Sequence, residues 1–66
     1  MQKKLYSIEF RHTDIAPDAR DLMTEWSDVE ATSENEAFES NARTFHAAYP
    51  SRGIVSQVVL AIGAAS

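Results

Sequence analysis

The stretch SENEAFESNARTFHAAY, residues 33–49, decides how this 66-residue chain folds. Ser33 and Glu36 have the spacing of a capping box. In that motif the serine hydroxyl accepts a hydrogen bond from the backbone N–H three residues on, and the glutamate reaches back to the serine N–H. Pro50 disfavours helical geometry at Tyr49. The stretch therefore predicts a helix that begins after Ser33 and ends near Tyr49.

One side of this helix is apolar. At about 100° per residue, six side chains share or border a single stripe: Phe38, Ala42, Phe45 and Tyr49, widened by Ala37 and Ala48. An isolated helix of this length is only marginally stable in water. We therefore expect the stripe to pack on a sheet.

The segment before the long connection, residues 3–13, alternates in polarity as a half-buried strand does. Four side chains are expected to face the helix: Tyr6, Ile8, Phe10 and His12. We interpret His12 as a strand-end histidine at the margin of the core, with a pH-sensitive or ligand-binding role as the alternative.

Residues 12–22 form a long connection in which Pro17 predicts a short helical turn over residues 17–23. Asp14, Asp18 and Asp21 also lie in this connection. The spacing, the glycine and the closing glutamate of an EF-hand are missing. We interpret these acids as part of a solvated loop, with a cation site as the alternative.

A second strand is expected over residues 25–32, with Val29 and Ala31 toward the helix. Trp26, Asp28 and Glu30 then point to the opposite face, with the two carboxylates about 6.8 Å apart along the strand. An outward tryptophan beside two carboxylates indicates an interface. The alternative is that Trp26 folds over an edge and covers the core.

The last strand, residues 53–62, is apolar on both faces. One face is expected to carry Ile54, Val58, Leu60 and Ile62, and the other Val55, Val59 and Ala61. A strand apolar on both sides is typically buried on both sides, and one helix cannot cover both faces of a small sheet. We therefore expect a homodimer with an interface at Val55, Val59 and Ala61, and a loose tail over residues 63–66.

These elements make one α+β domain over residues 1–66. A hairpin joins the first two strands, and the helix returns the chain for the third. The simplest arrangement is a three-stranded antiparallel sheet of β-β-α-β connectivity and order 2-1-3, with the helix packed on one face. The other face then combines Leu5 and Trp26 with Glu9, Arg11 and Asp28, among other residues.

Composition excludes several classes of protein. The chain has no cysteine and no apolar run of membrane-spanning length, and its start lacks the apolar core of a signal peptide, so we expect a cytoplasmic protein. No nucleotide-binding or hydrolase motif is present. The two histidines, His12 and His46, lack metal-ligand spacing. We expect no enzyme, cofactor or metal site. A small-molecule-binding or enzymatic domain that uses either histidine is a further hypothesis.

Charge is distributed unevenly. Nine carboxylates and only one basic residue, Arg20, lie within residues 14–39, whereas the net charge of the chain is −4. An acidic middle argues against direct nucleic-acid binding, which depends on phosphate contacts, and suits a basic protein partner. Six side chains are the candidate contacts: Glu25, Trp26, Asp28, Glu30, Glu36 and Glu39. The alternative is an ordinary solvated acidic face.

The run VEATSENEA, residues 29–37, resembles the V-E-A-x-S-x-x-E-A junction of small β-β-α-β proteins from bacteriophages and mobile elements, including some anti-CRISPR proteins. That resemblance implies a phage-type inhibitor that binds a basic, DNA-handling surface of a Cas complex, in part as a DNA mimic. It transfers no site residues, because anti-CRISPR proteins share no functional motif.

A second run, TSENEAFESNA over residues 32–42, resembles the helix start of HicB-type antitoxins, which block a small ribonuclease. The chain lacks the Gly-Cys element that usually precedes that helix and the DNA-binding segment that follows. An anti-CRISPR inhibitor is therefore the leading hypothesis. A HicB-like antitoxin or a small accessory interaction domain is the alternative.

Overall fold

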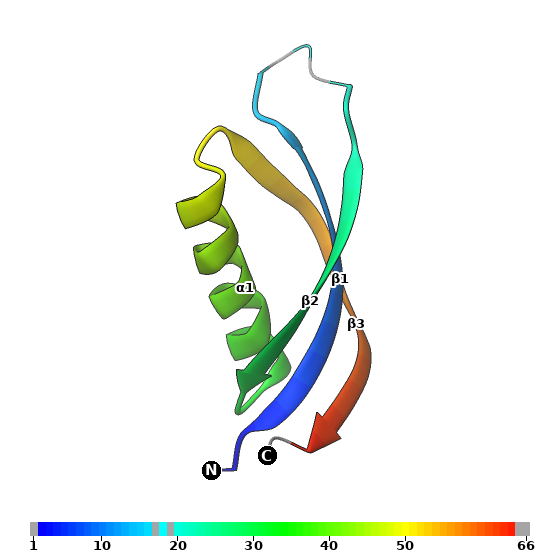
Figure 1. The fold of residues 1–66 in the computed structure, drawn as a ribbon, viewed down its shortest axis with the longest axis vertical. Coiled ribbons are helices and arrows are strands. Elements are labelled where there is room, and N and C mark those ends of the chain that lie inside the picture. Colours follow the sequence, from blue (N-terminus) through cyan, green and yellow to red (C-terminus); the bar gives the residue numbers. More distant parts are fainter. Residues whose placement is uncertain (1, 17, 19, 65–66) are drawn as a thin grey trace.

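The computed structural model describes residues 2–16, 18 and 20–64, and in that part of the chain three strands and one helix form (Figure 1). They are β1 (Lys4–Asp14), β2 (Met23–Ala31), α1 (Glu34–Ala48) and β3 (Arg52–Ala64). The strands are antiparallel in the order β2-β1-β3, and the helix covers one face. The expected α+β class and strand order are confirmed.

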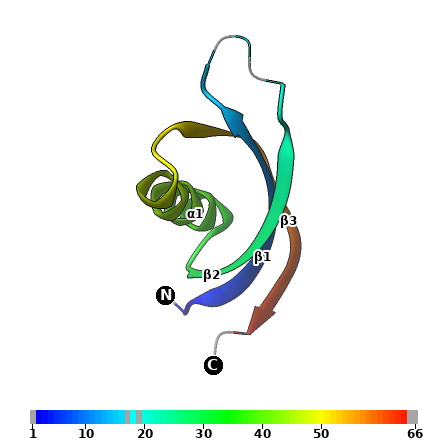
Figure 2. The ribbon, with the colours of Figure 1, turned by 45° about the horizontal axis from the view of Figure 1, so that its top comes forward.

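The core lies between α1 and the central strand. The sheet is strongly curved, and α1 lies on its concave side (Figure 2). Alternate residues of β1 supply Tyr6, Ile8 and Phe10, and Ile8 has no exposed surface. Across from them, α1 contributes Ala37 and Phe45. The alternation expected in the first strand therefore holds, because only one face of β1 meets the helix.

The start of α1 is capped as expected. The Ser33 hydroxyl accepts a 3.2 Å hydrogen bond from the Glu36 N–H. The Glu36 carboxylate accepts from the Thr32 hydroxyl, rather than from the Ser33 N–H as expected. At the other end, the Tyr49 N–H donates to the Phe45 carbonyl at 2.8 Å, which closes the helix. α1 is neither long nor apolar enough to cross a membrane, and it is the one helix in the described part of the chain.

The buried side of α1 differs from the expected stripe at one polar residue. Asn41 is buried, whereas Tyr49 is 46% exposed. The Asn41 amide accepts from the Ser27 hydroxyl at 2.8 Å and donates to the Gln57 side chain at 2.8 Å. Burying an amide is tolerated when its hydrogen bonds are satisfied. Asn41 therefore links the helix to both outer strands, a role that hydrophobic periodicity could not indicate.

The predicted faces of β3 hold for Ile54, Ala61 and Ile62 but are exchanged in the stretch between two bulges, which shift its register. Val55 is an extra residue opposite β1, between the pairs His12–Ile54 and Arg11–Ser56. Leu60 is a second extra residue, between the pairs Ile8–Val59 and Ser7–Ala61. Each extra residue shifts the alternation of side chains by one position, so that the residues after it point to the opposite face of the sheet. The second bulge restores the original alternation. Val59 therefore packs against the core, and Val58 is on the far face, opposite to the prediction for both.

Two local expectations also fail. The helical turn over residues 17–23 is absent from its described part, because β2 begins at Met23 and residues 20–22 are irregular; Pro17 itself lies outside the described residues. The loose tail over residues 63–66 is wrong for Gly63 and Ala64, which pair with β1. Residues 65 and 66 lie outside the described part.

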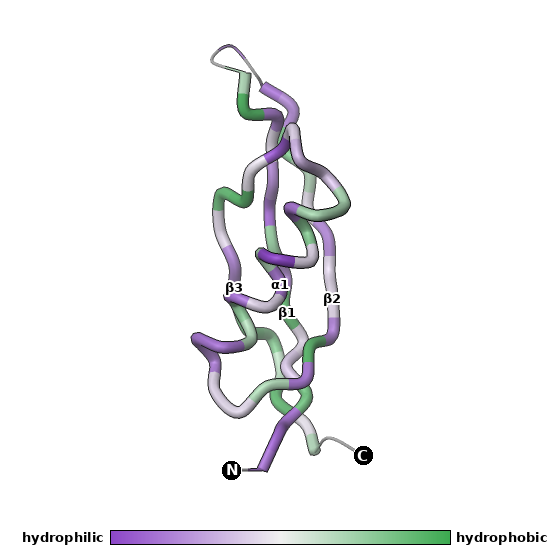
Figure 3. The backbone as a smooth tube through the Cα atoms, turned by 90° about the vertical axis from the view of Figure 1, so that its left-hand side faces the viewer, coloured by the Kyte–Doolittle hydropathy of each residue, from purple (hydrophilic) through white to green (hydrophobic). Residues whose placement is uncertain are grey.

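Seen from the helix side, β3 and β2 lie on either side of α1 (Figure 3).

Candidate protein-binding surface

The face of the sheet that points away from α1 has no element of the described chain packed on it. We call it the outer face. Strand register assigns twelve side chains to it: Leu5, Ser7, Glu9, Arg11, Thr13, Thr24, Trp26, Asp28, Glu30, Ser56, Val58 and Ala61. Their alternation with the core residues follows from the two-residue period of a strand. The outer face is therefore the surface on which the predicted interface residues of β2 can be judged.

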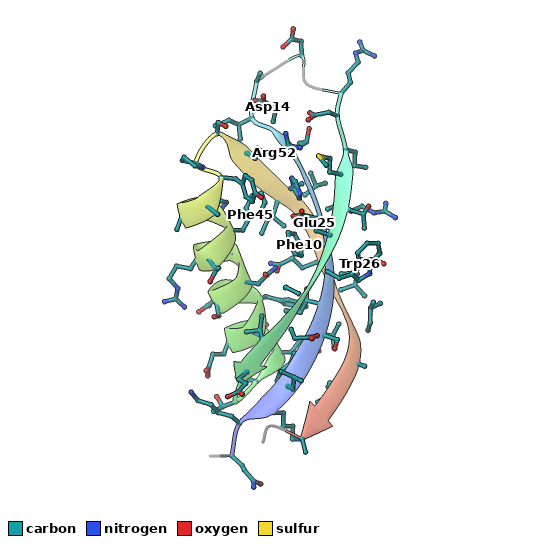
Figure 4. All side chains as sticks on the ribbon, in the orientation of Figure 1. Phe10, Asp14, Glu25, Trp26, Phe45 and Arg52 are labelled. Carbon is teal, nitrogen blue, oxygen red and sulfur yellow. The ribbon has the colours of Figure 1, made fainter. Side chains whose placement is uncertain are left out.

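Trp26 lies about halfway along β2, which is an edge strand of the sheet. It pairs across the sheet with Glu9, which pairs in turn with Val58 on β3. Its side chain points away from the helix (Figure 4) and is 64% exposed. The alternative in which Trp26 folds over an edge to cover the core is therefore wrong. An indole ring in this position is a large apolar surface with one free N–H donor.

Two carboxylates follow Trp26 on the same side of β2. Asp28 accepts a 2.8 Å hydrogen bond from the hydroxyl of Ser7, its neighbour on β1. Glu30 is two residues further on and is exposed. The sequence did not single out Ser7; its place on the same face as Trp26 was the available signal. The bond reduces the rotamer freedom of Asp28 and so holds one negative charge beside the tryptophan.

The six predicted contacts do not form one surface. Trp26, Asp28 and Glu30 share the outer face. Glu25 pairs with Phe10 and so lies on the helix side of β2, where it bonds to His12. The remaining two, Glu36 and Glu39, are exposed on α1, which covers the opposite side of the sheet. The structure therefore separates the predicted set into an outer-face group, a helix group and Glu25.

His12 belongs to a polar cluster with Glu25 and Arg52, two residues that are labelled in Figure 4. It is 3% exposed, well inside the margin that the sequence suggested. Its Nδ1 accepts from the Arg52 Nε–H at 2.8 Å, and its Nε2 lies 3.1 Å from a Glu25 carboxylate oxygen. A guanidinium only donates and a carboxylate only accepts. These partners assign the neutral tautomer, with the proton on Nε2.

Arg52 extends this cluster to the β1–β2 connection. Its Nη1 donates to Asp21 at 2.8 Å, and Asp21 also accepts from the Thr13 hydroxyl at 3.3 Å. Asp14 accepts from the Ala16 N–H at 3.0 Å. In the described residues, no group of three histidine or acidic side chains converges to hold a metal ion. Asp14 and Asp21 therefore order the connection through hydrogen bonds.

The ion pair with Arg52 makes stability depend on pH. The hydrogen bond from Arg52 lowers the pKa of Asp21 from its ordinary value, assisted by the Asp14 backbone N–H. A lowered folded-state pKa stabilises the fold above the unfolded-state pKa of about 3.9, and this contribution is lost as the pH falls through the folded-state pKa.

We expect Asp21→Asn to lower the melting temperature at pH 7. The difference from the wild type should shrink below about pH 4; a difference independent of pH would contradict the assignment.

The residues predicted for a dimer interface are also separated. Ala61 is on the outer face, Val59 packs against the core, and Val55 is an extra residue at a bulge. Val59 is therefore removed from the predicted interface. His46 is exposed on α1, with its ring 5.7 Å from the Phe45 ring. That position agrees with a residue at the boundary of the apolar stripe.

Comparisons with protein families, with characterised proteins and with solved structures give no match.

Proposed function

We propose that this chain is a small inhibitory binding protein of the anti-CRISPR kind. It applies its outer face to a basic, nucleic-acid-handling surface of a Cas effector complex in the bacterial cytoplasm and so blocks DNA binding. The observation that carries the proposal is Trp26, exposed halfway along the edge strand β2 on the outer face, beside a carboxylate held in place by Ser7. The binding is non-enzymatic and needs no cofactor.

Trp26 supplies the aromatic anchor. Tryptophan is among the residues enriched at binding hot spots, which lie near the centre of an interface and are surrounded by contacts that exclude water. Val58 and Ala61 add apolar surface on β3, and Leu5 adds it on β1. A bound partner would bury this apolar surface, and that burial favours binding in a way that a purely charged surface could not.

Charge on the outer face supplies the preference for a basic partner. Three carboxylates, from Glu9, Asp28 and Glu30, lie there with one guanidinium, from Arg11. Such an excess steers association with a basic surface and disfavours acidic partners. Asp28 and Glu30 project from one strand about 6.8 Å apart. They present a short row of negative charges where a nucleic acid would present phosphates.

Two double variants with the same net charge test the location of the site. Asp28→Lys with Glu30→Lys changes the outer face, and Glu36→Lys with Glu39→Lys changes α1. Each replaces two acids by lysines and brings the formal net charge from −4 to zero. We expect the outer-face variant to bind its partner roughly tenfold more weakly and the helix variant to bind like the wild type. Both replace exposed side chains, but Glu36→Lys also removes the bond from Thr32 at the helix start, so thermal unfolding of both variants is compared with the wild type before binding is measured.

The measurement is capture of partners from lysates that contain CRISPR complexes, with identification by mass spectrometry. A Cas complex held by the wild type and the helix variant, but not by the outer-face variant, supports the proposal. Capture of a small ribonuclease would instead support the antitoxin alternative. Equal loss in both variants would indicate a dependence on net charge, and equal retention would exclude Asp28 and Glu30 from the site.

A further inference from the structure

The free edge of β3 carries an inference that goes beyond the proposed function. We propose that two copies of this chain pair in antiparallel fashion through their β3 edges and form one continuous six-stranded sheet. The occupant of the edge is thus the β3 strand of a second copy. This pairing differs from the predicted interface at Val55, Val59 and Ala61, which required one face of the strand rather than its edge.

β3 has the composition of a central strand but lies at the edge of the sheet. It carries no charged residue from Gly53 to Ala64. Four of its large apolar side chains are more than half exposed: Val55, Val58, Leu60 and Ile62. Proteins usually protect an edge strand with charges, proline or very short length. β3 is 13 residues long and lacks these protections, apart from its two bulges.

The opposite edge of the sheet is protected. β2 carries three acids, Glu25, Asp28 and Glu30, and is shorter, at nine residues. Pairing two such edges would set carboxylates of one copy near those of the other, which is unfavourable. The contrast between the two edges assigns association to β3.

The backbone of β3 is in a geometry that can accept another strand. Its pairing with β1 is regular from Ser56 to Val59 and from Ala61 to Ala64. Alternate N–H and C=O groups of an antiparallel strand point away from its partner, so a β3 that ends the sheet presents them outward. The outward-pointing N–H and C=O groups of a second β3 would form hydrogen bonds with these groups.

A groove beside this edge offers space for side chains of the added strand. It lies between α1 and β3, and its apolar lining includes Phe38, Ala42, Ile54 and Val55. Phe38 and Ile54 are only partly buried within a single chain. Because an added strand sends alternate side chains to the helix side of the sheet, apolar residues of the second β3 would cover this lining.

Charge and surface area favour a second copy over another partner. Two chains of net charge −4 meet at the edge through neutral strands, and antiparallel self-pairing closes with two-fold symmetry. The chain is elongated, and its accessible surface of 4630 Å² exceeds the roughly 4,200 Å² expected for a monomer of 7.3 kDa. Two chains together expose roughly 900 Å² more surface than two typical monomers of this mass. This surplus area is close to the ~1,000 Å² that a specific interface buries.

The test combines sedimentation velocity over a concentration series with amide hydrogen exchange followed by NMR, both on the isolated protein. We expect a monomer–dimer equilibrium in which protection that rises with concentration is concentrated in the amides of β3. Leu60→Lys places a lysine on the edge strand and should weaken dimerisation roughly tenfold or more. Leu22→Lys is the matched control, because Leu60 and Leu22 are 56% and 55% exposed.

Three results would overturn the inference. The first is a monomer throughout the series up to high micromolar concentration. The second is a dimer in which added protection or chemical-shift change centres on Trp26, which would indicate packing of outer faces instead. The third is equal dimerisation by the two lysine variants. None of these results involves a partner protein, so failure here leaves the proposed binding function to its own test.

Discussion

Replacing Phe45 by alanine is expected to lower the free energy of unfolding by about 3–5 kcal/mol, the range for removing a buried phenylalanine side chain. Phe45 is 4% exposed and belongs to the core cluster between α1 and β1. Its ring meets Phe10 edge-on, with the centroids 5.7 Å apart, and lies 4.7 Å from the imidazole of His12. The substitution removes contacts to both residues at once and leaves a cavity beneath the helix.

A loss of this size is a large part of the total stability. A 66-residue domain is expected to have an unfolding free energy of roughly 3–10 kcal/mol. Equilibrium urea denaturation measures the change, and a measurable unfolded fraction of Phe45→Ala is expected without denaturant. Tyr49→Ala is the comparison, since Tyr49 is 46% exposed against 4% for Phe45 and its loss should cost less. A loss below about 1 kcal/mol for Phe45→Ala would contradict the packing of α1 on β1.

Replacing Trp26 by alanine is expected to weaken binding of the captured partner by at least about 2 kcal/mol, roughly thirtyfold in dissociation constant. The reason is that the indole is the largest exposed apolar side chain on the outer face, where a bound partner would remove it from water. Stability should hardly change, because the side chain makes little contact with the core. Isothermal titration calorimetry gives the affinity, and thermal unfolding gives the stability.

Two controls separate a specific anchor from general loss of apolar surface. Trp26→Phe keeps an aromatic ring and should retain more of the affinity than Trp26→Ala. Leu22→Ala removes an exposed apolar side chain from the β1–β2 connection, away from the outer face, and should bind like the wild type. Unchanged affinity in Trp26→Ala would show that the outer face is not the binding surface.

The general fold could be predicted because its signals are local. The spacing of Ser33 and Glu36 marks the helix start through a bond between neighbouring residues. Alternation along β1 identifies its buried side because one face of that strand meets the helix. The strand order then follows from short connections between antiparallel elements. Each of these inferences needs only a few adjacent residues.

The errors arise where the structure depends on contacts between distant segments. The bulges at Val55 and Leu60 are properties of the pairing with β1, and nothing in the sequence of β3 alone marks them. The burial of Asn41 depends on Ser27 and Gln57, which come from two different strands. Hydrophobic periodicity assigns only apolar residues to the buried face of a helix, so it cannot predict a buried amide such as that of Asn41.

The candidate surface was predicted in part. Alternation along β2 placed Trp26, Asp28 and Glu30 on one face, and their register agrees. Glu25 was added for its charge alone, although alternation places it on the other side of the strand, where it bonds to His12. Charge along a sequence therefore identified acidic residues, and the strand geometry decides which of them face the same way.

The central position of β1 sets the order in which this fold is completed during synthesis. β1 and β2 can form a hairpin while the chain is still being made, and α1 follows directly. The second neighbour of β1 is the last strand, and its ladder reaches from Lys4 to Ala64. Contacts this distant in sequence slow folding because the intervening chain must first be ordered. A nascent chain that ends before β3 therefore leaves one edge of its own central strand open until β3 has emerged from the ribosome.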